Sequence, residues 1–180
     1  MKQYAITRTV SGEEIKACRK RMGLTQAEFA GLVNSSKKTV ERWEGAEAGV
    51  SGPIVSLVKV LSENLQIEEK LVIPEKVYPV RLKYMHKSEI CTIIDVDEVS
   101  RKIKIHNYTQ YPLMRAFGRV EAPTFDQYEE FLESRCFPRT RDKMKLILKD
   151  LDLPFYEPFM IIEKTEGRMA EDDFWIQIER

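Results

Sequence analysis

Histidine and cysteine, the residues that build most metal centres and redox sites, are scarce in this sequence. The 180 residues include three cysteines and two histidines. Neither His86 nor His106 is spaced from a cysteine or carboxylate as zinc ligands are, and no Cys-x-x-Cys pair occurs. An odd number of cysteines far apart argues against a disulfide framework and fits a reducing cytoplasm. We therefore expect a cytoplasmic protein with no metal site and no cofactor.

Signatures of catalysis and of membrane association are missing as well. The chain has no glycine-rich phosphate loop, no kinase catalytic loop and no Gly-x-Ser-x-Gly sequence. No apolar run approaches the length that spans a membrane, and residues 1–10 lack the apolar core of a secretion signal. These absences predict a protein that is not an enzyme and has no membrane partner.

One dense group of carboxylates leaves an enzymatic alternative open. Glu171, Asp172 and Asp173 are consecutive, and paired acids such as Asp172 and Asp173 can hold magnesium for phosphoryl chemistry. The group follows a glycine that ends a predicted helix and precedes a predicted aromatic strand, a setting in which acidic residues more often stabilise a turn. The cluster is therefore either turn chemistry or a metal-dependent active site.

Opposite charges balance over the whole chain but not along it. The sequence has 29 Lys/Arg and 29 Asp/Glu. Residues 1–62 contain ten basic and six acidic residues, whereas the remainder contains 19 and 23. This asymmetry indicates that the first part suits a polyanionic partner and that the second part does not.

A short helix, a tight turn and a second helix are predicted between Thr25 and Gly45. Thr25 and Glu28 are spaced as a capping box, so the first helix should begin directly after Thr25. Ser36 offers a fresh N-cap for the second helix, over residues 37–44. Two short helices joined in this way are typical of a helix-turn-helix.

The outward face of the second helix is polar and mostly cationic. Lys37, Lys38, Thr39 and Arg42 lie there. Cations near the start of a helix are poorly placed for its dipole, so helix stability is a weak reason for the two lysines. A phosphate-lined major groove is a better one. The alternative is a solvated basic face on an ordinary helical domain.

The run from Glu13 to Gly45 matches a family pattern. It reads EEIKACRKRMGLTQAEFAGLVNSSKKTVERWEG, with an arginine, Leu-Thr-Gln, Phe-Ala, Ser, Thr-Val and Trp-Glu-Gly in order and at family spacing. Residues 12–62 thereby resemble the Cro/repressor-type (XRE family) helix-turn-helix. The resemblance implies a sequence-specific DNA-binding domain that acts as a dimer on double-stranded DNA.

The same resemblance implies which residues touch DNA. Thr25 and Gln26 take the positions that hold phosphate, and Lys37, Lys38 and Arg42 take the base-reading positions. The residues implied to bind DNA are Thr25, Gln26, Ser36, Lys37, Lys38, Thr39 and Arg42.

Two further features follow from the family pattern. Arg19 and Glu44 occupy the positions of the family's structural ion pair, which ties the first helix to the end of the recognition helix. Residues 45–49, Gly-Ala-Glu-Ala-Gly, depart from the family pattern, which has a glycine and a basic tract there.

Residues 1–72 are expected to form this helix-turn-helix domain, all-α with four to five helices and an N-terminal arm. Residues 1–10 alternate as a strand would, and such an arm must pair with a dimer mate or with the second domain. Ser11 and Glu14 form another capping box. Residues 73–78, which contain a proline after a helical run, are the predicted linker.

Residues 79–180 are predicted to form a small α+β domain for dimerisation or partner binding. Alternation at residues 80–84, 90–97 and 103–106 predicts an antiparallel meander of three strands. A helix should start after Thr124, with Gln127 completing its capping box. Further helices are predicted at residues 142–150 and 158–164, and FWIQIE near the end reads as a strand that could join the meander.

Two patterns in this second part resemble a segment found ahead of the kinase domain in some HipA-type toxin proteins of bacteria. They are Arg-x-x-Pro-x-x-Arg from Arg135 to Arg141, and Gly-x-x-x-x-Asp-x-Phe-Trp-Ile over residues 167–176. The kinase itself is absent, so the resemblance implies a role beside a toxin-type partner. Arg135, Arg139 and Arg141 are candidates for partner binding, or else lie on a solvated helix flank with packed stems.

These observations predict a DNA-binding transcriptional regulator, the antitoxin and autorepressor of a bacterial toxin-antitoxin operon. The alternatives are a stand-alone phage-type repressor and a metal-dependent enzyme that uses Asp172 and Asp173. As a dimer, the regulator would bind a roughly palindromic operator whose half-sites lie about 34 Å apart.

Overall fold

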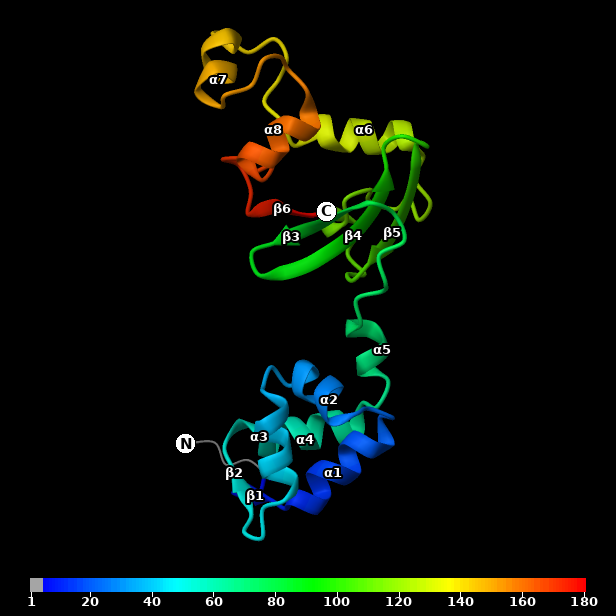
Figure 1. Cartoon of the computed structure of the whole chain (residues 1–180), viewed down its shortest axis with the longest axis vertical. Coiled ribbons are helices and arrows are strands. Elements are labelled where there is room, and N and C mark those ends of the chain that lie inside the picture. Colours follow the sequence, from blue (N-terminus) through cyan, green and yellow to red (C-terminus); the bar gives the residue numbers. More distant parts are fainter. Residues whose placement is uncertain (1–4) are drawn as a thin grey trace. The chain divides into compact units, whose positions relative to one another are not determined.

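The computed structural model describes residues 5–180, which divide into two compact units between Ile73 and Pro74 (Figure 1). The first unit contains β1 (Thr9–Val10), α1 (Gly12–Arg21), α2 (Gln26–Leu32), α3 (Lys37–Glu44), β2 (Val50–Ser51), α4 (Pro53–Glu63) and α5 (Ile67–Leu71). The second contains β3 (Val80–His86), β4 (Glu89–Asp97), β5 (Lys102–Asn107), a 3₁₀ turn (Pro112–Met114), α6 (Phe125–Ser134), α7 (Met144–Asp150), α8 (Pro158–Thr165) and β6 (Phe174–Glu179).

The first unit is not all-α, so that prediction was wrong. Residues 9–10 and 50–51 form a two-stranded antiparallel sheet, with Thr9 opposite Ser51 and Val10 opposite Val50. The predicted arm therefore pairs within its own unit; its residues 1–4 lie outside the described residues. Gly49 permits this pairing, because a Cβ there would lie 2.8 Å from the Thr9 Cβ.

Local signals set the helix starts of the first unit. The capping boxes of Ser11 with Glu14 and of Thr25 with Glu28 are both formed, and Ser36 caps α3 by accepting from the Thr39 amide. The helices enclose one apolar core. Its most deeply buried members are Ile15, Cys18, Phe29 and Val40, each with 0% exposure.

The second unit is a four-stranded antiparallel sheet with helices on one face. The strand order is β5-β4-β3-β6, so the predicted last strand joins the meander beside β3. Figure 1 shows α6 and α8 over the same face of this sheet. Tyr128 of α6 and Ile161 of α8 are fully buried in the core that the sheet and helices share with Leu82 and Ile94.

The other face of this sheet holds a buried ion pair that fixes the chain before β3. Arg81 binds Asp95 through two hydrogen bonds of 2.6 and 2.8 Å. Arg81 also donates to the Pro74 carbonyl, and Asp95 accepts from the Val77 amide. Much of the predicted linker, from Pro74 onward, is thus held against β3 and β4.

Candidate nucleic-acid interface

The packed side of α3 is held against the rest of the first unit. Val40 is fully buried, Trp43 packs against the same core, and α2 and α1 both lie against α3. Position 12 has no room for a side chain, because a Cβ on Gly12 would lie 2.6 Å from the Trp43 carbonyl oxygen and 2.7 Å from that of Glu44. The start of α1 therefore fixes the end of α3 by direct backbone contact.

The Glu44 carboxylate joins three elements at that end of α3. It accepts from Arg19 Nε at 2.6 Å, from Arg19 Nη2 at 3.0 Å and from Gln26 Nε2 at 2.9 Å. The Arg19 hydrogen bonds lower the pKa of Glu44 and outweigh the effect of burial, which acts in the opposite direction. Arg19 also donates to the Leu24 carbonyl at 2.8 Å. The predicted pair of Arg19 and Glu44 is present, and Gln26 extends it.

The opposite side of α3 is exposed and carries four charged side chains. Lys37, Lys38, Glu41 and Arg42 are all exposed, and we call them the reading face. Lys37 forms an ion pair with Glu41 at 3.5 Å, with side-chain exposures of 61% and 47%. Within residues 5–180, neither the Lys38 side chain nor the Arg42 side chain has an ion-pair or hydrogen-bond partner. Two cations of the reading face are therefore free to bind an anion.

The hydroxyl and amide groups of the predicted site have partners inside the unit. Thr25 accepts from the Glu28 amide, and Gln26 is bound to Glu44. Ser36 accepts from the Thr39 amide at 3.1 Å, and the two hydroxyls lie 2.8 Å apart. Of these residues, Thr25 and Ser36 remain exposed. Thus the polar residues position the two helices, while the charged residues face outward.

Glu41 is a member of the reading face that the predicted site did not include. The signal was present, since Glu41 follows Lys37 by four residues and such residues are neighbours on a helix. The loop after α3 adds no cation to this face, because residues 45–49 contain only Glu47 as a charged side chain.

The three candidate arginines of the second unit have different settings. Arg135 is 7% exposed, and it binds Asp172 at 2.7 and 3.0 Å as well as the Gly167 carbonyl. Arg139 is exposed, lies 4.4 Å from the Tyr156 ring centre and pairs with Glu133. Arg141 is exposed and 6.0 Å from the Phe137 ring centre. Arg139 and Arg141 are thus exposed, whereas Arg135 is bound inside its own unit.

The carboxylate cluster is spread over different ion pairs. Asp172 is bound to Arg135, which lowers the pKa of this carboxyl, and Asp173 pairs with Lys87 at 3.3 Å. In the part of the chain that the structure describes, no three His, Cys, Asp or Glu side chains converge as metal ligands. The geometry of Asp172 is that of a structural partner for a buried arginine.

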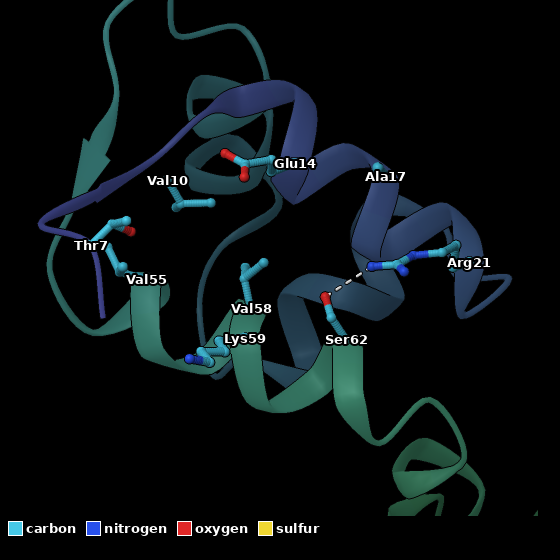
Figure 2. Close-up of a pocket in the computed structure, with 9 residues that line it drawn as sticks. All are labelled: Thr7, Val10, Glu14, Ala17, Arg21, Val55, Val58, Lys59 and Ser62. Carbon is cyan, nitrogen blue, oxygen red and sulfur yellow. Dashed lines mark hydrogen bonds between the residues drawn. The ribbon is translucent and has the colours of Figure 1, made fainter. Parts of the chain in front are cut away.

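A cavity of about 320 Å³ lies on another side of α1, against α4 and the segment before β1 (Figure 2). Its cationic groups have partners in the chain: Arg21 donates to the Ser62 hydroxyl at 3.0 Å, and Lys59 donates to the Ala5 carbonyl at 3.0 Å. Its floor is apolar, with Val10 and Val58. The cavity therefore offers a ligand few free polar groups, in contrast to the reading face.

None of the helices in residues 5–180 combines the length and the apolar character needed to cross a membrane. The chain matches no family model, no curated protein and no solved structure.

Proposed function

We propose that the protein is a sequence-specific DNA-binding regulator of transcription and that α3 enters the major groove. One observation carries the proposal: α3 is fixed on one side by Gly12 and Glu44 and presents Lys38 and Arg42, free of partners among the described residues, on the other. The resemblance of residues 12–62 to the XRE-type helix-turn-helix supports the same assignment.

The chemistry of the reading face suits both parts of DNA recognition. Lysine and arginine neutralise phosphates and release counterions, which supplies affinity that falls steeply with salt. The same side chains donate to the O6 and N7 acceptors of guanine in the major groove, which supplies sequence preference. A rigid helix makes these contacts at a defined register, because its backbone does not have to be ordered on binding.

In this proposal the protein binds as a dimer to a roughly palindromic operator, and it serves as antitoxin and autorepressor beside a toxin-type partner. The exposed Arg139 and Arg141 are the candidate contacts for that partner, since Arg135 is occupied by Asp172. Co-purification of residues 1–180 with the product of a neighbouring gene, and its loss in the Arg139→Ala/Arg141→Ala variant, would support this setting. A stand-alone repressor would bind its operator fully without any such partner.

The DNA-binding proposal is tested by selecting binding sites from a random duplex pool and titrating the selected site by fluorescence anisotropy. Arg42→Ala should weaken binding by about 1–3 kcal/mol and relax the preference at one base pair. Lys145→Ala is the matched control, because it removes one exposed positive charge from α7 in the second unit. Failure to select any sequence, or equal losses in the two variants, would refute the proposal.

A further inference from the structure

The reading face consists of two rows of side chains with different charge. Residues four apart are neighbours on a helix, so Lys37 and Glu41 form one row and Lys38 and Arg42 form the other. The first row is an ion pair of opposite charges at 3.5 Å, and the second row is purely cationic. Only one of the two rows is therefore a simple phosphate-binding surface.

Helix stability gives a weak reason for Glu41. The pair has the lysine on the N-terminal side, which is the less favourable order for residues four apart, and Lys37 is the first residue of α3, where the dipole disfavours a cation. Both side chains are also about half exposed, so solvent and salt screen their attraction. Fold stability does not require an acid at this position.

Nor does affinity for phosphate explain a carboxylate there. A negative charge beside Lys38 and Arg42 repels phosphate and occupies Lys37, so it lowers binding to DNA of any sequence. A carboxylate that weakens binding to DNA of any sequence can still increase specificity, because it repels those base sequences that present acceptors to it.

We propose that Glu41 is a specificity-determining residue that accepts a hydrogen bond from the N4 amino group of a cytosine. Lys37 binds the acceptors of a guanine in the adjacent base pair. This inference rests on the proposed function, since it assumes that α3 lies in the major groove.

The donor and acceptor pattern of the groove selects cytosine. Cytosine presents its N4 amino donor there, whereas guanine and thymine present the acceptors O6 and O4, which repel a carboxylate. Adenine has an amino donor at N6, but its N7 acceptor lies beside that donor and repels a carboxylate, so cytosine is the preferred partner. The Lys37 ammonium and the Glu41 carboxylate lie 3.5 Å apart, which is close to one base-pair step of about 3.4 Å. Lys37 and Glu41 can thus address neighbouring positions while they stay paired to each other.

The experiment uses the full chain and the site that the wild type selects from a random duplex pool. A C·G to T·A change at the proposed position should weaken wild-type binding about tenfold or more, and this ratio should fall close to one in Glu41→Ala. Glu41→Gln keeps the side-chain shape and should shift the selected base toward adenine, because glutamine binds adenine N6 and N7.

A second readout is the salt dependence of binding to random duplex. Removal of Glu41 frees Lys37 for phosphate, so the slope of log K against log salt should steepen by about 0.9, and binding to random DNA should tighten. Glu63→Ala removes another exposed acid, from α4, and is the matched control for net charge. It should leave the base preference of the wild type unchanged.

The outcomes separate this inference from the function beneath it. If Glu41→Ala and Glu41→Gln select the same bases as the wild type at every position, Glu41 does not read sequence, while the DNA-binding function stands. If the wild type selects no site, the proposed function fails, and the role of Glu41 fails with it. Thermal unfolding of each variant, followed by Trp43 fluorescence in a Trp175→Phe background, should match the parent protein, because the Glu41 side chain is exposed.

Discussion

Glu44→Gln is the substitution that most directly tests how α3 is held in place. The Glu44 side chain is 5% exposed and accepts three hydrogen bonds, two from Arg19 and one from Gln26. Glutamine has nearly the same shape but no charge, so the Arg19 guanidinium would stay buried at 11% exposure without its counterion. Removal of one partner from a buried pair typically costs 3–5 kcal/mol.

The expected loss is at the low end of that range, about 3 kcal/mol, because Arg19 keeps its hydrogen bond to the Leu24 carbonyl. For a unit of this size each kcal/mol lowers the melting temperature by roughly 4–8 °C, so a drop of more than about 10 °C is expected. The matched control is Glu41→Gln on the same helix. It breaks an exposed pair and should change stability by less than about 1 kcal/mol.

The chain provides its own reporter for this measurement. Trp43 and Trp175 are its two tryptophans, one in each unit, so Trp43 fluorescence in a Trp175→Phe background follows the first unit alone. Thermal melts of the wild type, Glu44→Gln and Glu41→Gln would be compared in that background. Equal melting temperatures for the two glutamine variants would refute the reasoning.

The pH dependence gives an independent check on the same carboxylate. The Arg19 hydrogen bonds hold the folded pKa of Glu44 below its unfolded value of about 4.3. Its contribution to stability is therefore fully present above about pH 4.3 and is lost as the pH falls through the folded pKa. The gap in melting temperature between the wild type and Glu44→Gln should shrink on acidification. A gap that stays constant from pH 7 to pH 3 would contradict the assigned cause.

Two further predictions concern the packing of each unit. Gly12→Ala should lower the melting temperature of the first unit, because its Cβ would lie within 2.7 Å of two carbonyl oxygens at the end of α3. Gly31→Ala is the control: its Cβ would meet no neighbouring side chain within 4 Å, so the change should be neutral or slightly stabilising. Equal effects of the two substitutions on the melting temperature would contradict this. Burial raises the pKa of the Cys136 thiol to about 12, so iodoacetamide should not label this thiol in the native protein at pH 8. Mass spectrometry measures the labelling, and a rate equal to that of the unfolded protein would contradict the burial of Cys136.

Helix starts could be predicted from the sequence because their causes are local. A capping box needs two side chains three residues apart, and the boxes that begin at Ser11, Thr25 and Thr124 are all formed. The outward cations of α3 were predictable for the same reason, since one helical period and one N-cap decide which side chains face the core. These short-range rules located most of the reading face.

The small sheet of the first unit could not be found in this way. Each of its strands has two residues, too few for an alternating pattern to be visible. Its formation depends on the approach of Gly49 to Thr9, a contact between residues 40 positions apart. The alternation of the arm was readable, but the residues that pair with it were not.

The residues that a long side chain contacts could not be predicted from the sequence either. Arg19 lies in α1 and Arg135 directly follows α6, and both arginines are buried. Only the family resemblance indicated that Arg19 pairs within the fold, whereas Arg135 was expected among the partner-binding residues. Its carboxylate partner, Asp172, lies 37 residues away and was itself a candidate for metal binding. Neither role is set by local sequence.

Buried arginines of this kind also change how the charge of the chain is interpreted. Arg19, Arg81 and Arg135 each bind one carboxylate through two hydrogen bonds and donate further to a backbone carbonyl. Each pair cancels one charge of each sign, so the net charge of the chain stays at zero and does not indicate which of the remaining charges face a partner. A phosphate near α3 responds to charges within about 8 Å at physiological salt. The exposed Lys38 and Arg42, which have no ion-pair partner among the described residues, therefore affect such a phosphate more directly than the net charge of the chain does.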